Sequence, residues 1–158
     1  MNISDLLAPD AVIAALKAQS KKQLLQELAA RTHSLKGLPE RRVFETLMER
    51  ERLGTTGVGS GIAIPHGRMA EVKTITGLFV RLDSAIEYEA VDSQPVDLVF
   101  MLLAPENAGA DHLKALARVS RLLRDRQVCE KLRAAATPEA LYAILTGHKD
   151  GGAGIQAA

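Results

Sequence analysis

The chain has 158 residues, of which 47% are hydrophobic and only 3% are aromatic, so we expect one compact domain with an aliphatic core. Twenty basic residues nearly balance nineteen acidic ones, and the net charge of +1 argues against the basic surface and aromatic platform of a nucleic-acid-binding protein. No stretch approaches the roughly 20 apolar residues of a membrane-spanning helix, and Asp5 and Asp10 interrupt any secretory signal. We therefore expect a cytoplasmic protein with no membrane insertion.

The first part of the chain is predicted to be mainly helical. Residues 12–18 are ambiguous between a strand and a helix. A helix is then expected from Ser20, a good N-cap, to Gly37, which ends it. Pro39 lies where a second helix would begin, and Gly54 ends that helix.

Apolar segments predict strands in the middle of the chain. Residues 62–64 form a short buried strand inside a glycine-rich loop, and residues 74–82 combine β-branched with other apolar side chains. Residues 96–104, VDLVFMLLA, predict a strand, and all of them except Asp97 are apolar, which is typical of a central strand covered on both faces. Residues 85–88 predict a shorter strand between the last two.

Three helices are predicted in the last third of the chain. Asp111 is expected to cap the first, a second covers residues 125–136, and a third covers residues 137–147, with proline in its first turn. Cys129, the single cysteine, falls in an apolar phase of the second helix, so we expect it to be buried and free of any disulfide within the chain. Residues 148–158 are small and polar, which predicts a flexible tail.

This order of helices, strands and helices predicts a single α/β domain over residues 1–147. No internal repeat or interior linker divides it. Because at least one strand must be covered on both faces, we expect a helix–sheet–helix sandwich whose central sheet has mixed strand direction.

The glycine-rich segment 57–68, GVGSGIAIPHGR, is first compared with the known phosphate-binding loops. The dinucleotide fingerprint fails because Ile62 occupies the place of its third glycine. The P-loop fails because Arg68 follows Gly67 where lysine is required, and the nucleophile elbow fails because Val58 precedes Gly-Ser-Gly in place of the required glycine. The spacing therefore excludes all three.

The four histidines show no metal-binding spacing. His33, His66, His112 and His148 form no His-Glu-x-x-His or His-x-His motif, and the chain has no cysteine pair. No metal site is therefore expected. His33 is expected to cap its helix, and His148 lies at the start of the tail.

His66 has the setting of a nucleophile. Pro65 stiffens the backbone before it, and Gly67 leaves one face of its ring open. A neutral imidazole can donate one N–H to a backbone carbonyl and point its other nitrogen outward. The alternative from these residues alone is an ordinary turn histidine beside a proline.

His112 and an arginine could complete an anion site. His112 falls in the first turn of a helix, where free N–H groups and the helix dipole favour an anion and keep the imidazole neutral. Packing on the apolar face of its own helix is the alternative. Arg50 and Arg52 both end a helix that enters the glycine-rich segment, and physical reasoning does not choose between them.

Three segments resemble the enzyme IIA domains of the bacterial phosphotransferase system, of the mannitol/fructose type and most closely the nitrogen-related branch: MERERLGTTGVGSGIAIPHGR, QPVDLVFMLLAP and DHLKALARVSRLLRD. The similarity covers almost the whole chain, from SDLLAP to LYAIL. It implies a central mixed sheet flanked by helices on both faces.

The resemblance also implies roles for individual residues. The family's histidine in IAIPHG accepts a phosphoryl group from a small HPr-like carrier, and it corresponds to His66. The second active-site histidine corresponds to His112, and the active-site arginine corresponds to Arg50 rather than Arg52. No cofactor or metal is implied, because the donor brings the phosphoryl group.

Four residues in and just before the glycine-rich segment are expected to bind the phosphoryl oxygens: Thr55, Thr56, Ser60 and Gly61. Ser60 stands where many nitrogen-branch members have asparagine, and it keeps a hydrogen-bonding hydroxyl on a shorter side chain.

The implied function is that of a regulatory phosphocarrier in the nitrogen phosphotransferase system. Its donor would be an HPr-like (NPr) protein, and its targets would include sensor kinases or potassium transporters. One alternative is a sugar-transport enzyme IIA that relays phosphate to an enzyme IIB. Another is a metal- or ligand-binding module without phosphotransfer.

Overall fold

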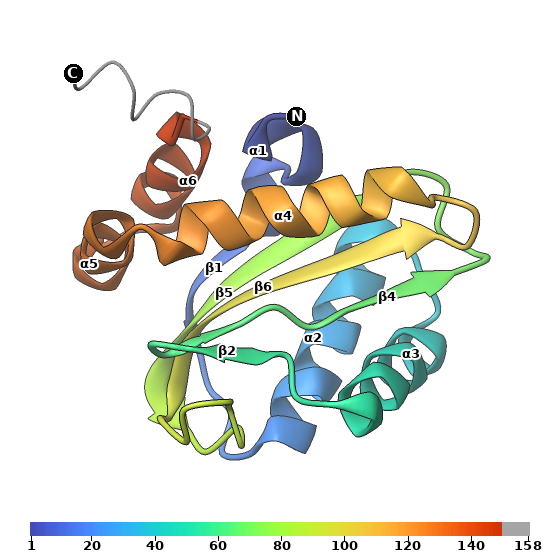
Figure 1. Cartoon of the computed structure of the whole chain (residues 1–158), viewed down its shortest axis with the longest axis horizontal. Helices are drawn as coiled ribbons and strands as arrows, with labels where there is room; N and C mark the ends of the chain where they lie inside the picture. Colours follow the sequence, from blue (N-terminus) through green and yellow to red (C-terminus); the bar gives the residue numbers. More distant parts are fainter. Residues whose placement is uncertain (150–158) are drawn as a thin grey trace.

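A mixed sheet lies between two layers of helices in the computed structural model, which describes residues 1–149 (Figure 1). Helix α4 crosses one face of this sheet, and helices α2 and α3 lie on the other (Figure 1). The elements of the described chain are α1 (Ile3–Leu6), η1 (Pro9–Ala11), β1 (Val12–Leu16), α2 (Lys21–Lys36), α3 (Glu40–Leu53), β2 (Gly57–Gly59), β3 (Ile62–Ala63), β4 (His66–Met69), β5 (Thr76–Ile86), β6 (Val96–Pro105), α4 (Ala110–Arg124), α5 (Arg126–Ala134) and α6 (Pro138–Gly147). The expected mixed α/β sandwich is confirmed.

Strand β6 is the centre of the sheet, as its continuous apolar run predicts. Within residues 1–149 the strand order is β1-β5-β6-β3-β2, and β4 also pairs with β6. Strand β5 runs antiparallel to β6, whereas β3 and β4 run parallel to it. Strand β1 pairs in parallel with β5, which resolves the ambiguity of residues 12–18 in favour of a strand.

The local signals at the first two long helices act as expected. The Ser20 hydroxyl accepts the N–H of Gln23 at 3.1 Å and so caps α2. Gly37 ends that helix with a φ of 73°, a left-handed conformation that glycine adopts at little cost. Pro39 is the N-cap of α3, and Gly54 follows its last residue.

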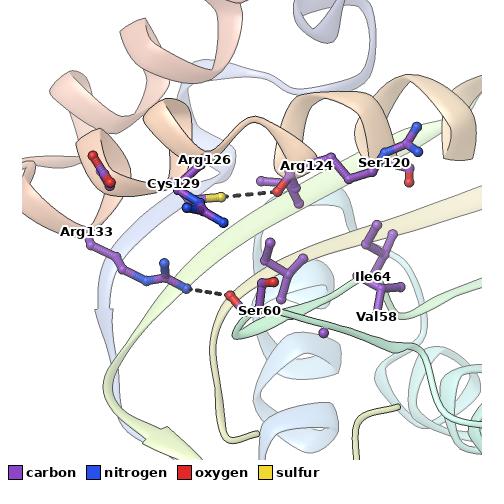
Figure 2. A pocket seen from close by; sticks show the side chains of 12 residues that line it. Val58, Ser60, Ile64, Ser120, Arg124, Arg126, Cys129 and Arg133 are labelled. Carbon is purple, nitrogen blue, oxygen red and sulfur yellow. Dashed lines mark hydrogen bonds between the residues drawn. The ribbon is translucent and has the colours of Figure 1, made fainter. Parts of the chain in front are cut away.

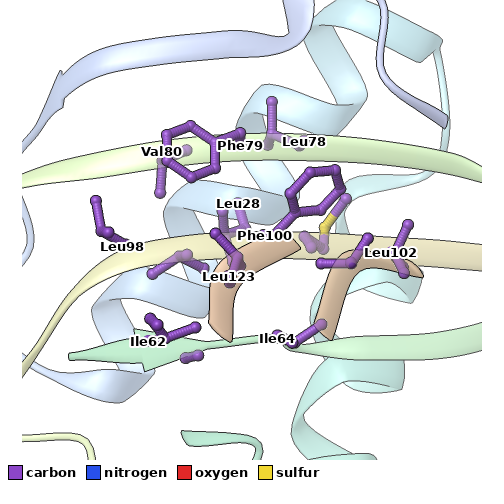
Figure 3. Close-up of a cluster of buried hydrophobic side chains, with 14 of the residues drawn as sticks. Leu28, Ile62, Ile64, Leu78, Phe79, Val80, Leu98, Phe100, Leu102 and Leu123 are labelled. Carbon is purple, nitrogen blue, oxygen red and sulfur yellow. The ribbon is translucent and has the colours of Figure 1, made fainter. Parts of the chain in front are cut away.

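The core is built from aliphatic side chains on both faces of β5 and β6. Leu28 of α2 and Leu123 of α4 approach these strands from opposite sides (Figure 3). Phe79 and Phe100, from the two strands, meet edge to face with ring centroids 6.2 Å apart. Each fully buried leucine or phenylalanine contributes about 1.5–3 kcal/mol to the free energy of unfolding.

Two predicted elements are corrected in the middle of the chain. Residues 85–88 do not form a separate strand, because β5 continues without a break from Thr76 to Ile86. The glycine-rich loop is partly sheet, since Gly57–Gly59 and His66–Met69 are strands. Neither Gly57–Gly59 nor His66–Met69 has a run of β-branched residues, so pairing with neighbouring strands rather than local preference determines their conformation.

The helix ends of the last third differ in detail from the prediction. Gly109, with a φ of 57°, is the N-cap of α4, and Asp111 lies exposed in the first turn instead of capping it. Helix α5 covers Arg126–Ala134 instead of residues 125–136, because the Asp125 side chain caps it by accepting the N–H of Gln127. Helix α6 matches its prediction.

Three further expectations concern burial and termini. Cys129 is buried, and its thiol donates to the carbonyl of Leu123 at 3.2 Å. None of the helices formed by residues 1–149 is long and apolar enough to cross a bilayer. Most of the predicted tail, residues 150–158, lies outside the described residues, whereas His148 packs against α4 and its carbonyl accepts from Arg118 at 2.7 Å.

Candidate active site: a histidine pair with two arginines

Strand β4 fixes His66 at the edge of the sheet. His66 is opposite Leu102 of β6 in the register, and the N–H of Leu102 donates to the carbonyl of Pro65 at 3.0 Å. A Cβ on Gly67 would collide with the side chain of Thr46, so glycine is needed for α3 to pack this closely on β4. Arg50 lies one helical turn beyond Thr46 and therefore reaches the His66 ring.

The hydrogen bonds of His66 define its tautomer. Nδ1 lies 2.8 Å from the carbonyl oxygen of Ile64, which can only accept, so Nδ1 carries the proton. Arg50 donates its Nε–H to Nε2 of His66 over 3.3 Å, so Nε2 has the lone pair. Arg50 is itself held by the carbonyl of Gly54, 2.7 Å from its Nη1. The outward nitrogen expected from the sequence is therefore Nε2.

His112 has the opposite tautomer. Its side chain comes from the first turn of α4 and the residue is only 4% exposed. The Nε–H of Arg68 donates to Nδ1 of His112 at 3.0 Å, which places the remaining proton on Nε2. That Nε2 is buried and has no hydrogen-bond partner within residues 1–149. A buried donor without a partner is costly, and an incoming acceptor would satisfy it.

The two rings lie close together and both are neutral near pH 7. Their centroids are 5.6 Å apart and their planes meet at 71°. Burial lowers the pKa of His66 below 6.5, and the Arg50 guanidinium lowers it further, although the Ile64 carbonyl acts the other way. Burial, helped by the neighbouring His66 and Arg68, lowers the pKa of His112 to about 4.

These residues line an open cleft of about 670 Å³ between α3, β4 and α4. Arg52 and Glu49 also line it, so arginine side chains outnumber the carboxylate there. Leu53 and Leu113, which are 85% and 65% exposed, form part of its rim. The cleft combines cationic and N–H groups with an apolar edge, which suits an anion carried by another protein.

The two candidate arginines are separated by their contacts. Arg50 bonds His66 directly, whereas Arg52 is exposed and makes no hydrogen bond or ion pair within the described part of the chain. The geometry therefore favours Arg50, in agreement with the resemblance.

Thr55 and Thr56, which come just before the glycine-rich segment, do not line the cleft. Thr56 is buried, and both its N–H and its hydroxyl donate to the carboxylate of Glu51. The Thr55 hydroxyl accepts the N–H of Gly57 at 3.0 Å. These polar groups are already used to hold the segment in shape, so they are not placed to bind a phosphoryl group on His66.

Ser60 and Gly61 are also away from His66. The N–H of Ser60 donates to Asp92 at 2.9 Å, and its carbonyl accepts from Arg133 at 3.0 Å. Gly61 has a φ of 81°, and a Cβ there would lie 2.5 Å from the Arg133 guanidinium. Neither residue lines the cleft. The structure therefore brings His66, His112 and Arg50 together, but not the four expected phosphate-binding residues.

Two residues were missed in the sequence: Arg68, which lines the cleft, and Glu51, which is buried and does not line it. Arg68 is two positions after His66, so both side chains lie on the same face of β4. That signal was hidden while the segment was interpreted as a loop. Glu51 is buried and accepts hydrogen bonds from Thr56 and Lys21, and these lower its pKa below 4.5 although burial alone would raise it.

The remaining histidines lie elsewhere. The ring of His33 is 2.9 Å from the carbonyl of Leu38, close to the end of α2. His148 lies 3.5 Å from a carboxylate oxygen of Asp125. Among residues 1–149, no group of three or more histidine, cysteine, aspartate or glutamate side chains is arranged to hold a metal ion.

Comparison with known proteins places this site in a family. A family model for the phosphoenolpyruvate-dependent sugar phosphotransferase system, EIIA 2, matches residues 5–148. A nitrogen regulatory protein of Bradyrhizobium diazoefficiens is 60% identical, covering 92% of this chain and 95% of its own length. The nitrogen regulatory protein of Escherichia coli K12 is 42% identical, covering 92% of this chain and 90% of its own length.

Solved structures agree. The crystal structure of nitrogen regulatory protein IIA-Ntr from Neisseria meningitidis has a TM-score of 0.86 and 38% identity, covering 91% of this chain and 99% of that chain. The mannitol IIA of Escherichia coli, 21% identical, shares the fold with a TM-score of 0.71 over 87% of this chain and 97% of that chain.

The chain belongs to the EIIA 2 family of the phosphoenolpyruvate-dependent sugar phosphotransferase system. Within that family, relatives between 40% and 60% identical are nitrogen regulatory proteins, so the expected resemblance to the nitrogen-related branch is confirmed.

Proposed function

We propose that this chain is a regulatory phosphocarrier: Nε2 of His66 accepts a phosphoryl group from an HPr-like (NPr) phosphohistidine protein, and the phosphorylation state controls partner proteins. The observation that carries the proposal is the tautomer of His66. The Ile64 carbonyl holds Nδ1–H, and the lone pair of Nε2 lies beside the Arg50 guanidinium at the cleft. Family membership and the names of the nitrogen regulatory relatives support it.

The chemical step exchanges one phosphorus–nitrogen bond for another. The Nε2 lone pair attacks the phosphorus while the bond from phosphorus to the donor's imidazole nitrogen breaks, and the donor nitrogen keeps that electron pair. His66 retains its Nδ1 proton on Ile64 throughout. Such a transfer depends mainly on positioning and on stabilising the charge of the equatorial oxygens, and it requires no metal or nucleotide.

Arg50 and His112 stabilise that charge. The Arg50 guanidinium, now directed at Nε2, has donors suited to phosphoryl oxygens. The buried Nε2–H of His112, which has no partner within the described residues, donates a further hydrogen bond as the side chains adjust. Because the pKa of His112 is about 4, the imidazole stays neutral at pH 7, and the hydrogen bond from Arg68 to Nδ1 keeps its proton on Nε2.

Phosphorylation of His66 would control partner binding by changing the charge of the surface around it. A phosphoryl group adds about −1.5 to −2 charges near neutral pH, on a protein whose net charge is +1. It does so beside the exposed Leu53 and Leu113, which offer apolar contact to a partner. Cytoplasmic targets, among them sensor kinases or potassium transporters, would distinguish the two forms at this surface.

The test is phosphorylation with labelled phosphoenolpyruvate, enzyme I and the HPr-like carrier. The wild type and a His33→Ala control should gain an acid-labile label, whereas His66→Ala should gain none. His112→Ala should still be labelled, but at least tenfold more slowly, because it loses a donor to the transition state. Equal labelling of His66→Ala would refute the proposal, and passage of the label to a sugar-specific enzyme IIB would identify a relay instead of a regulator.

A further inference from the structure

A pocket of about 470 Å³ lies between the glycine-rich segment and the helices α4 and α5 (Figure 2). In Figure 2 the labelled Val58, Ser60 and Ile64 form one wall, and the labelled residues of the two helices form the other. Its volume falls in the range typical of small-molecule sites. It shares no lining residue with the cleft around His66.

The pocket has an apolar part. Val58, Ile62 and Ile64 from the segment, together with Leu123 of α4, line it. This combination of aliphatic side chains with a few polar groups is the usual lining of a ligand pocket.

The charged side chains that line the pocket differ in whether they have ion-pair or hydrogen-bond partners. Arg133 is paired through two nitrogens with Asp97 at 2.9 Å each, and it also donates to Ser60, so its charge is compensated and it holds the wall in place. Arg124 and Arg126 also line the pocket, but within residues 1–149 their exposed side chains make no hydrogen bond or ion pair. Glu130 adds one opposing carboxylate.

Two unpaired guanidinium groups, opposed by the single carboxylate of Glu130, leave this part of the pocket net positive, and their two forks suit an anion of charge near −2. A phosphate monoester carries about this charge at pH 7, and its oxygens match the guanidinium fork. We propose that this pocket binds a small organic phosphate monoester, with its phosphate paired to Arg124 and Arg126 and its organic body against Ile62, Ile64 and Leu123.

Nuclear magnetic resonance titration with adenosine 5′-monophosphate as the probe tests this proposal. Millimolar probe should shift the amide signals of Val58, Ser120 and Cys129. Adenosine lacks the charge and inorganic phosphate lacks the apolar body, so each should bind at least tenfold more weakly. The absence of shifts, shifts confined to the His66 cleft, or equally tight binding of succinate would overturn the proposal.

Variants provide a test that depends on the sign of the charge. Arg124→Gln combined with Arg126→Gln should weaken binding at least tenfold, whereas Glu130→Gln should strengthen it. Arg31→Gln combined with Arg41→Gln, at exposed positions of α2 and α3, is the matched control and should change nothing. If the control weakens binding as much as the pocket variant, the attraction is non-specific and the site is not where we place it.

This inference is independent of the proposed phosphotransfer. The pocket and the cleft share no lining residue, and His66 meets the pocket wall at the backbone carbonyl of Ile64, so the probe should bind His66→Ala as tightly as it binds the wild type. Loss of binding in His66→Ala would overturn the assignment to this pocket. Absence of labelling in the phosphorylation experiment would leave the binding result unaffected.

Discussion

The Nε atom of Arg68 lies 3.0 Å from Nδ1 of His112, and this contact determines which nitrogen of His112 carries a proton. At His66 the arrangement is reversed, since Arg50 approaches Nε2 at 3.3 Å. One arginine thus faces the Nδ1 of its histidine and the other faces Nε2. As a result, His66 has a lone pair on Nε2, and His112 has a proton on the equivalent atom.

Replacing Arg68 tests this arrangement. Arg68→Gln should slow phosphoryl transfer to His66 roughly tenfold, the effect of losing one hydrogen bond from a charged donor. It should also raise the pKa of His112, because the cation now lowers it. Transfer rates from the carrier and the histidine resonances measure the two effects. Arg42→Gln, which breaks an exposed pair with Glu71, is the control; an unchanged pKa of His112 in Arg68→Gln would contradict the assignment.

His112 should make stability depend on pH. Its folded-state pKa of about 4 lies below the ordinary value of 6.5, so between these values the unfolded chain binds more protons than the folded one. The free energy of unfolding should therefore fall as the pH falls from 6.5 toward 4. Urea titrations across this window should show a smaller fall for His112→Gln, whereas His33→Gln should match the wild type. Parallel curves for His112→Gln and the wild type would rule the effect out.

Replacing Glu51 should lower the free energy of unfolding more than replacing Glu45, another glutamate of α3. Its buried carboxylate accepts hydrogen bonds from Thr56 and Tyr88 and pairs with Lys21 at 3.1 Å. Glu51→Ala leaves these groups unpartnered and should lower the free energy of unfolding by about 3 kcal/mol. Glu45→Ala, which removes an exposed pair, should cost no more than about 0.5 kcal/mol. Similar urea midpoints for the two variants would contradict this role.

Ser60 has a conformation that its side chain does not favour. Its φ is 58°, in the left-handed region where asparagine is several-fold enriched over most residues. Ser60→Asn should therefore raise the free energy of unfolding by about 0.5 kcal/mol, and Ser60→Gly should also be tolerated. Thermal unfolding measures the change, with Ser84→Asn as a control in β5. A destabilised Ser60→Asn would mean that contacts with the loop outweigh backbone preference.

Much of the fold was predictable because the strongest signals are local. Ser20, Gly37 and Gly54 delimit helices through their own caps and conformations. The apolar run of β6, residues 98–104, has no other favourable place than the centre of the sheet. The positions of His66 and His112 made them candidates, the resemblance to enzyme IIA domains selected Arg50, and the fold brings the three side chains together.

The errors arose where partners distant in sequence decide the structure. Strand β4 has no strand pattern of its own and exists because β6 supplies its hydrogen bonds. Arg68 could not be assigned without that strand. The expected role of Thr56 failed for the same reason, since Tyr88, 32 positions away, and Glu51 bind its hydroxyl.

His66, the proposed phosphoryl acceptor, begins a strand that is paired residue by residue with the centre of the sheet. Because this pairing holds the backbone around His66 in place, phosphorylation has little scope to change the backbone conformation. We expect the phosphorylated and unphosphorylated forms to superimpose closely. Partners would distinguish the two forms by electrostatic repulsion or attraction beside the exposed Leu53 and Leu113. Phosphorylation would then change the charge of the surface around His66 while the fold stays the same.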